Sequence, residues 1–315
     1  MGLTLSQSAE YANADTLSQG VVDTFVYADP LLERMKFETY ASNAYAYDQE
    51  LTLPDGDWYG INEDWDSKNP TVEKQYAIMK MIGGAIDIDD FQISIHSSTN
   101  DLKQQQLEKR IKGIKKTFNE TLYYGNRTTN PKEPDGLHVL INNTTYNTIL
   151  ADRSDTGTVA LSMSDHLDQA LEMVKGYTSS LIVTSKRLRR GILKYLRSVS
   201  GIQSSRDDFG HMRTIWGDGN IPIVSSDHLS AAELTSSGAF SARTGGATSS
   251  IFVLTFEPGG LEGLHVRPME TLPYKEHGNG NSVRARVRWY VTWKIESLIS
   301  CVKIVGIDSD GTVVA

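Results

Sequence analysis

The sequence predicts an α+β fold, with one long helix and with strands drawn from separate parts of the chain. Between residues 100 and 124, apolar residues recur every three to five positions, as on a helix with one buried face. Residues 282–294 alternate strictly between apolar and polar side chains, as in a strand with one buried face. From residue 137 onward, short segments of both kinds follow one another, which completes the prediction of a mixed fold.

Composition limits the classes of protein to consider. The 315 residues suffice for one large or two closely packed domains, and 39% hydrophobic with 22% charged residues is an ordinary globular balance. No apolar run approaches the roughly 18 to 20 residues of a membrane-spanning helix, and residues 1–19 lack the pattern of a secretory signal. A net charge of -8 argues against a dedicated nucleic-acid-binding protein. A single cysteine, Cys301, excludes an internal disulfide.

The first 80 residues contain two extended features. Residues 1–36 have too little apolar surface to fold alone, so we expect an N-terminal arm that orders against a neighbouring molecule. Residues 37–80 contain two strand-like runs around a polar tip rich in glycine, proline and acidic residues, which predicts a long protruding hairpin. An excursion of this size is uncommon unless something else contacts it.

The predicted helix follows a strand over residues 82–95. Thr99 or Asn100 can cap it and Gly125-Asn126 can end it, so about 24 residues would form a rod roughly 36 Å long. Its outer faces carry a stripe of basic residues on an otherwise acidic protein: Lys103, Lys109, Arg110, Lys112, Lys115 and Lys116.

Beyond residue 136 we expect helices and strands in alternation, separated by an exposed loop at residues 231–249 that is rich in small residues. Ser164 can cap one helix, and the second covers residues 185–198. The expected strands are at residues 137–141, 180–184, 214–224 (a hairpin), 251–256, 282–294 and 298–307.

No catalytic or metal-binding pattern stands out. The seven histidines are dispersed, and no nucleotide-binding or nucleophile motif is present. The acidic residues Asp87, Asp89 and Asp90 suit a solvated surface or a cationic partner better than a metal, and the calcium-like run at Asp308 lacks its later ligands. We therefore expect no enzyme activity, no cofactor and no metal.

Several phrases of the sequence resemble the major capsid protein family of tailed double-stranded DNA viruses. They occur in the family's order along nearly the whole chain, although each is weak alone. The phrases are residues 29–37 (DPLLERMKF), 47–50 with 53–54 and 60–63, 82–89 (IGGAIDID), 124–126 with 134–137, and 287–291 (VRWYV).

The resemblance implies the Hong Kong 97 fold, with four parts. These are an arm at 1–36, an extended hairpin loop at 37–80, a peripheral domain at 81–136 and 266–295 with a spine helix at about 100–124, and an axial domain at 137–265 and 296–315. Such subunits form pentamers and hexamers that close into the icosahedral head of a virion, assembled in the host cytoplasm. Portal, scaffolding and decoration proteins would be partners, without any membrane.

The resemblance also implies roles for two sets of residues. The hairpin would lie over an adjacent subunit, with contacts from Asp55, Asp57, Trp58, Tyr59, Asp64 and Trp65. The lysine stripe of the spine helix would line the inner wall and contact packaged double-stranded DNA weakly, or a scaffolding partner. Charge reversal at Lys109, Lys112 and Lys116 should then impair filling or assembly.

Three alternatives remain open on the sequence. An encapsulin-type shell would share the fold but enclose a cargo enzyme instead of DNA. An unrecognised soluble hydrolase would use carboxylates such as Asp87 and Asp89, and would predict a small oligomer with a deep pocket. A head-decoration or tail-tube protein would usually be shorter and would lack the spine helix.

Overall fold

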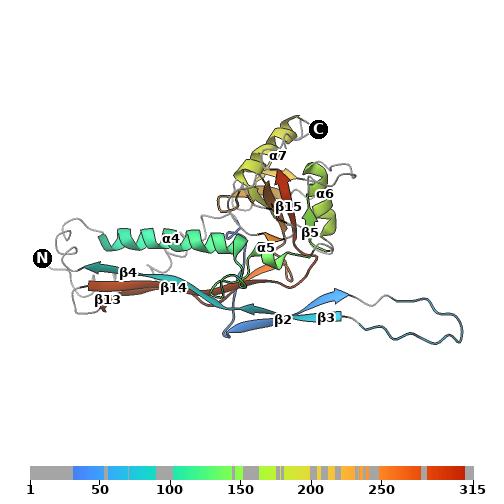
Figure 1. Ribbon diagram of the computed structural model, residues 1–315, viewed down its shortest axis with the longest axis horizontal. Coiled ribbons are helices and arrows are strands. Elements are labelled where there is room, and N and C mark those ends of the chain that lie inside the picture. Colours follow the sequence, from blue (N-terminus) through green and yellow to red (C-terminus); the bar gives the residue numbers. More distant parts are fainter. Residues whose placement is uncertain are drawn as a thin grey trace. The chain divides into compact units, whose positions relative to one another are not determined.

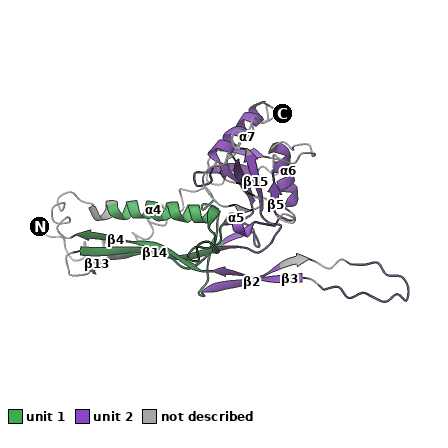
Figure 2. Ribbon diagram, viewed as in Figure 1, with its two compact units in different colours: residues 1–42, 79–136, 263–292 green, residues 43–78, 137–262, 293–315 purple. Residues whose placement is uncertain are grey.

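The computed structural model describes residues 31–52, 56–69, 71–89, 102–143, 146–151, 163–174, 178, 181–198, 204–206, 212–216, 221–230, 233, 235–236, 239–240, 248–277 and 282–308 (Figure 1). Residues 1–30 of the expected arm lie outside this part of the chain. The chain divides into two compact units (Figure 2). Unit 1 comprises residues 1–42, 79–136 and 263–292, and unit 2 comprises residues 43–78, 137–262 and 293–315.

Unit 1 is built on a four-stranded sheet in the order β1-β13-β14-β4. The strands are β1 (Phe37–Thr39), β4 (Lys80–Asp89), β13 (Leu261–His277) and β14 (Ser282–Ile295), of which β13 begins and β14 ends in unit 2. β14 and β4 are antiparallel over ten residue pairs, from Ser282 opposite Asp89 to Val291 opposite Lys80. In β14, buried and more exposed residues alternate from Ala285 to Val291, which confirms the predicted strand.

Helix α4 (Leu102–Tyr124) confirms the predicted long helix and packs on β4, as Figure 1 shows. Its buried apolar residues follow the helical period: Leu107, Ile111, Ile114, Phe118 and Leu122. The ring of Phe118 stacks on Trp289 of β14 at a centroid distance of 5.1 Å, and Phe37 of β1 contacts the same indole at 5.3 Å. These aromatic rings connect the helix and two strands, β1 and β14, in one core.

Unit 2 contains a seven-stranded mixed sheet in the order β5-β15-β12-β6-β9-β8-β7. Three helices belong to this unit: α5 (Leu137–Leu140), α6 (Met163–Met173) and α7 (Lys186–Ser198). The strands are β5 (Thr148–Leu150), β6 (Leu181–Ser185), β7 (Ser204–Arg206), β8 (Met212–Trp216), β9 (Ile221–Ser226), β12 (Thr248–Leu254) and β15 (Val302–Asp308).

One face of this sheet is covered by α6, which packs on β15, and by α7, which packs on β6 and β9. Apolar residues of both helices, among them Leu167 and Ile192, belong to one core with Ile182, Ile223 and Ile304 of the sheet. Unit 2 also contains the hairpin of β2 (Ala44–Thr52) and β3 (Thr71–Ile78), and the small pair β10 (Thr235–Ser236) and β11 (Ala239–Phe240).

The expected strand at residues 137–141 is wrong, because the structure has helix α5 there. Leu137, His138 and Ile141 are buried and lie on one helical face, and Ile141 N–H donates to the Leu137 carbonyl at 3.0 Å. A strand would place Val139 on the same face as Leu137, yet Val139 is 38% exposed. Periodicity cannot decide so short an apolar run.

Two further expectations need correction. Within the predicted exposed loop at residues 231–249, Glu233 is buried and pairs with Thr248 as an isolated bridge. The seventeen residues of β13 were not predicted as a strand at all. Its proline at position 268 and its charged residues hide the alternation that marks a strand. Among the described residues, no helix is long and apolar enough to cross a membrane.

Candidate assembly surfaces

The hairpin of β2 and β3 is confirmed as a two-stranded antiparallel ribbon. Its register runs from Ala44 opposite Ile78 to Thr52 opposite Thr71, with one irregularity near Glu50. The tip, residues 56–69, contains no strand, and Asp55 lies outside the described residues. Of the predicted contact residues, Asp57, Trp58, Tyr59, Asp64 and Trp65 are all placed on this tip.

Local contacts organise the tip. The rings of Tyr59 and Trp65 stack at a centroid distance of 5.0 Å with an interplanar angle of 3°, and Asp66 N–H donates to the Tyr59 hydroxyl at 3.2 Å. Gly60 N–H donates to the Glu63 carboxylate at 2.6 Å across a turn in which Asn62 has a φ of 66°. Asparagine tolerates this left-handed conformation better than most residues. These contacts give the tip a defined local conformation.

Large apolar side chains stand in solvent on the same tip. Trp58 is fully exposed, Ile61 is 96% exposed and Trp65 is 81% exposed. Soluble monomers rarely display such clustered apolar side chains, because their burial elsewhere is favourable. In an assembly they would provide contact area of the kind that dominates interface energetics.

The base of the hairpin is fixed by a buried cation. Lys294 of β14 forms ion pairs with Glu296 and, at 3.1 Å, with Glu262. Its ammonium lies 4.3 Å from the ring centre of Tyr45 in β2, and the Tyr45 hydroxyl donates to Glu296 at 3.3 Å. The two carboxylates raise the pKa of Lys294 against the opposing effect of burial, so the lysine stays charged. The first residues of β2 are thereby tied to the end of β14.

The predicted basic stripe lies on α4. Lys109, Arg110, Lys112 and Lys116 are exposed and Lys115 is half-buried, whereas the side chain of Lys103 is outside the described residues. The guanidinium of Arg110 lies where a Cβ at Gly84 of β4 would be, at 2.0 to 2.5 Å. Arg110 therefore packs along the sheet of unit 1, and Gly84 is required for that approach. Lys109, Lys112 and Lys116 recur at helical spacing and remain a solvent-facing row.

The carboxylate of Asp87 has a structural partner. It forms a two-pronged pair with Arg284 on the neighbouring strand β14, at 2.5 and 2.6 Å. The two residues are directly opposite each other in the β4–β14 register. This is a bidentate pair between a guanidinium and a carboxylate on adjacent strands. Because both carboxylate oxygens accept hydrogen bonds from Arg284, Asp87 is poorly suited to act as a catalytic base.

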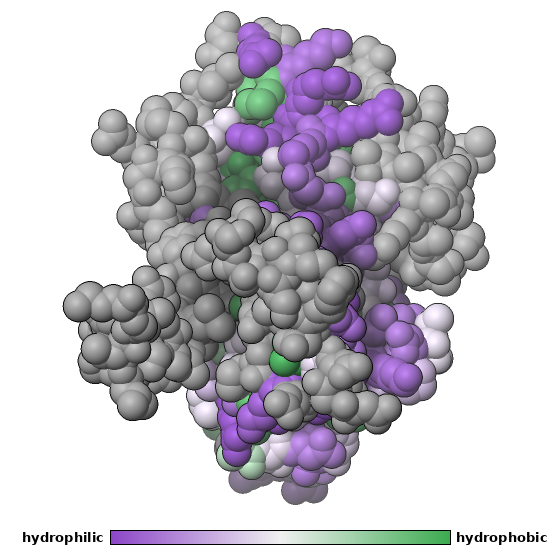
Figure 3. All heavy atoms as spheres, turned by 90° about the vertical axis from the view of Figure 1, so that its left-hand side faces the viewer, coloured by the Kyte–Doolittle hydropathy of each residue, from purple (hydrophilic) through white to green (hydrophobic). Residues whose placement is uncertain are grey.

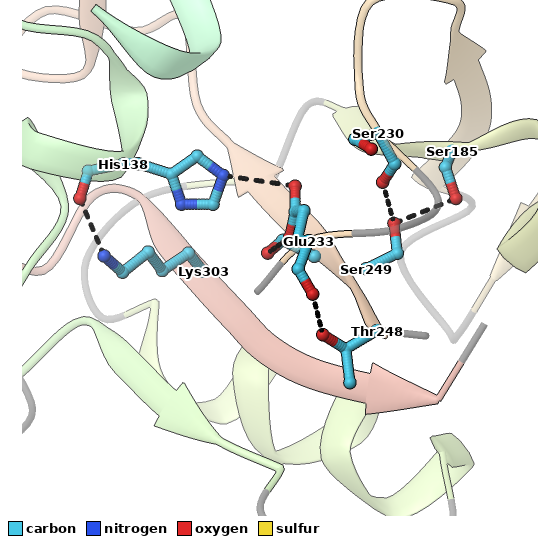
Figure 4. A network of polar contacts seen from close by, with 8 residues as sticks. His138, Ser185, Ser230, Glu233, Thr248, Ser249 and Lys303 are labelled. Carbon is cyan, nitrogen blue, oxygen red and sulfur yellow. Dashed lines mark hydrogen bonds and ion pairs between the residues drawn. The ribbon is translucent and has the colours of Figure 1, made fainter. Parts of the chain in front are cut away.

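A polar network is buried in unit 2, and the sequence did not reveal it (Figure 4). Lys303 of β15 donates to the His138 carbonyl at 2.8 Å and to the Asn142 side chain at 3.2 Å. The His138 ring lies 3.5 Å from the Glu233 carboxylate, which also accepts a hydrogen bond of 2.5 Å from Ser250. All three ionisable side chains are essentially inaccessible to solvent.

Hydroxyl groups extend this network along β12. Ser249 donates to the Ser230 carbonyl at 2.7 Å and lies 2.9 Å from the Ser185 hydroxyl, while Thr248 donates to the Glu233 carbonyl at 2.7 Å (Figure 4). Through these contacts Ser230 and Glu233 are held against β12. Only the context of the sheet could identify Glu233 as buried, since its sequence neighbours are small residues typical of a loop.

Burial determines the protonation of this network. It lowers the pKa of Lys303 to about 8, although the charge of Glu233 opposes the shift. It lowers the pKa of His138 as well, so that the imidazole is neutral near neutral pH. Among the described residues, no group of three or more His, Cys, Asp or Glu side chains could hold a metal ion. Cys301 is buried, and burial raises the pKa of its thiol.

No family model and no curated protein matches the sequence, but solved structures match almost its full length. The SrpI encapsulin of Synechococcus elongatus PCC 7942 aligns with a TM-score of 0.65 and 13% identity, covering 90% of this chain and 89% of that one. The capsid of a native GTA particle aligns with a TM-score of 0.62 and 9% identity, covering 88% and 89%. The capsid of Myoviridae phage XM1 aligns with a TM-score of 0.55 and 12% identity, covering 88% and 91%.

The chain has the Hong Kong 97 fold. A virus-like particle from Pyrococcus furiosus also aligns, with a TM-score of 0.51 over 92% of this chain. The exposed hairpin, the long helix α4 and the mixed sheet of unit 2 thus occur together in one chain that has this fold.

Proposed function

We propose that the chain is the major capsid subunit of a tailed double-stranded DNA virus, and that copies of it associate as pentamers and hexamers in an icosahedral head. The observation that carries this proposal is the alignment of 88 to 92% of the chain with 89 to 99% of chains from the capsids of a GTA particle and phage XM1 and from the procapsid of satellite phage P4. A match over the full length of both partners supports a common architecture better than a match of one domain would.

The hairpin tip supports assembly independently of the alignments. Trp58, Ile61 and Trp65 would be costly to leave in water, and the acidic residues Asp57 and Asp64 surround them. An apolar centre with a charged rim is the usual anatomy of a protein interface. The proposal assigns this tip to the contact with an adjacent subunit.

The exposed row on α4 is proposed to contact packaged DNA or a scaffolding partner. Three lysines can neutralise only a few phosphates, so the contact would be weak and would weaken further with salt. Reversal of charge at Lys109, Lys112 and Lys116 should reduce the DNA content of particles. An unchanged DNA content would remove this role from α4 without affecting the shell proposal.

A second candidate function is an encapsulin-type compartment, which the alignment with SrpI at a TM-score of 0.65 favours. The two functions place different contents inside the same kind of shell. The sequence phrases of the hairpin and of residues 287–291 resemble the viral form, and they are the reason for our preference.

The test is to purify particles from the natural source of the chain and to examine their contents. We expect closed polyhedral particles in negative stain that retain nuclease-resistant double-stranded DNA. Particles that instead protect one abundant enzyme from added protease would establish the compartment. A purified chain that remains a monomer or dimer, with neither rings nor shells in any preparation, would contradict both functions.

A further inference from the structure

Helix α7 of unit 2 carries basic residues and no acidic residue, although the protein as a whole is acidic. Its thirteen residues include six lysines and arginines and no acidic residue, and its apolar residues Leu188, Ile192 and Leu196 face the sheet. In Figure 3 the described side chains at the top of the view, where Figure 1 places α7, are predominantly hydrophilic. The basic stripe expected from the sequence was the one on α4, so this second surface was missed.

The basic side chains of α7 line a surface hollow of about 260 Å³. One half-buried apolar residue, Leu193, forms part of its lining. The hollow is lined by Lys186, Arg189, Arg190, Leu193, Arg197 and Ser225. Four cations around one concave surface repel each other unless an acidic partner is present.

Two observations indicate that part of this charge is not compensated within unit 2. The Arg189 Nε is buried and has no hydrogen-bond acceptor in the described part of the chain. Lys186 forms an exposed ion pair with Asp227, and no ion pair is formed by Arg190 or Arg197 among the described residues. The side chains of Arg190 and Arg197 are exposed, so the carboxylates of an acidic partner can reach them.

Helix α6 carries the opposite charge on the same face of the sheet. It contains three acidic residues, Asp165, Asp168 and Glu172, and no lysine or arginine. All three are exposed, and Asp168 accepts a hydrogen bond of 2.8 Å from the Trp216 indole. Asp165 and Glu172 are seven residues apart, which is two turns or about 10.5 Å along the helix.

We propose that α6 of one copy of this chain docks into the basic hollow on α7 of the next copy. This inference rests on the proposed shell function and specifies one of its contacts. Arg190 and Arg197 are also seven residues apart, so their spacing matches that of Asp165 and Glu172. The contact joins two different patches, which is the head-to-tail arrangement that closes into rings.

Phosphate groups of a nucleic acid are the competing occupant of the hollow. The second copy is favoured because the complementary acidic row lies on the chain itself with the same spacing, and because Leu193 offers an apolar contact that a phosphate backbone cannot use. The net charge of -8 also disfavours close approach of a nucleic acid to the chain as a whole.

The test compares two paired charge reversals, R190E/R197E on α7 and D165R/E172R on α6. Each should raise the protein concentration required for ring or shell formation by at least ~10-fold, because like charges then face each other. The matched control is R187E/K194E, which makes the same charge change at the same spacing on exposed residues of α7 that do not line the hollow. The control should have a much smaller effect. Light scattering and negative-stain microscopy measure assembly, and circular dichroism checks that each variant is folded.

Restoration of assembly is the decisive part of the test. The fourfold variant D165R/E172R/R190E/R197E, in which the two charges are exchanged, should assemble like the original chain. Mixing the two paired variants should also restore assembly, but only in rings where they alternate, so hexamers should form and pentamers should not. If a reversed variant is unfolded, the neutral pairs R190Q/R197Q and D165N/E172Q replace the reversals, and each should then weaken assembly.

Three results would overturn the proposal: unchanged assembly of the paired variants, no restoration by the exchange, or loss of bound nucleic acid without any loss of assembly. In each of these cases the original chain still forms shells, so the proposed function would stand. Failure of the original chain to form rings or shells would instead contradict the function itself.

Discussion

The sheet and the hairpin of unit 2 differ in the kind of side chain that each exposes to solvent. The sheet buries three ionisable residues, His138, Glu233 and Lys303, whereas the hairpin tip exposes Trp58 and Trp65. In the sheet, every one of the three ionisable side chains has neighbours within the chain that accept or donate hydrogen bonds or carry opposite charge. On the tip, the ring of Trp65 has one intrachain stacking partner and remains largely in water.

This difference shows which side chains have partners within the chain and which require another molecule to cover them. The buried polar side chains have hydrogen-bonding or charged neighbours within the chain, so changes there should alter the stability of the subunit. The exposed apolar rings are not covered by the described residues of the chain, so changes there should alter association and leave the subunit intact. Measurements on unassembled subunits and on assembled particles can separate the two.

The largest effect is expected from Lys303→Met. Removal of Lys303 leaves the His138 carbonyl and the Asn142 side chain without their donor, and Glu233 without a nearby positive charge. The loss of several buried polar partners of this kind typically costs about 3 to 5 kcal/mol of unfolding free energy. Urea unfolding of unassembled subunits measures this loss. The matched control is Lys186→Met at the exposed pair with Asp227, which should cost less than about 1 kcal/mol.

A double substitution sharpens this prediction. Lys303→Met combined with Glu233→Gln removes both charges, so the combined loss should be clearly smaller than the sum of the single losses. Additive losses would mean that Lys303 and Glu233 do not stabilise each other. The charges buried in the sheet would then lack compensation within the chain, as the exposed rings of the tip do.

The next effect is expected from Trp58→Ala on the hairpin. A fully exposed indole contributes nothing to the subunit fold, but as an interface anchor it would contribute about 2 to 4 kcal/mol to association. We expect unchanged unfolding of the subunit and a raised concentration threshold for assembly, followed by light scattering. Ser67→Ala, an exposed change on the same tip, is the control. Normal assembly of the Trp58 variant would exclude that ring from the contact.

The sequence predicted the regular elements of the chain and missed what depends on contacts between distant residues. Helix α4 and strand β14 follow clear periods, so their places could be read from the order of apolar residues. The hairpin tip was recognisable from its glycine, proline and acidic residues, and five of its six expected contact residues lie on it.

Burial of charge could not be predicted in the same way. Glu233 lies in a stretch composed mainly of small residues, and Lys303 was placed in an apolar strand without any indication of the carboxylate 70 residues earlier that affects its pKa. Both become buried only when β12 and β15 pair and bring the segment at Glu233 against them. The short helix α5 was mistaken for a strand for a related reason, since one helical turn carries no readable period.

An intermediate effect is expected from pH. The pKa of Lys303 is lowered to about 8 from its ordinary value near 10.5, so the unfolded chain binds a proton at this site more readily than the folded chain does. Stability should therefore rise with pH above about 8, by about 2 kcal/mol between pH 8 and 9.5. Lys303→Met should lack this rise in urea unfolding at the same pH values. A rise of equal size in the variant would assign the effect to other groups.

The smallest effect is expected from Asp87→Asn, which tests an exposed charge that has a partner within the chain. The carboxylate pairs with Arg284 at the surface of unit 1, where water and salt weaken such pairs, so we expect assembly thresholds within roughly twofold of the original. Light scattering at low and high salt measures the threshold, and Asp89→Asn on the same strand is the control. A large effect specific to Asp87 would mean that this ion pair holds more than its own two strands. This exposed pair would then stabilise the subunit, as the buried polar side chains of unit 2 do. Solvent exposure alone would no longer distinguish residues that stabilise the subunit from residues that form contacts between subunits.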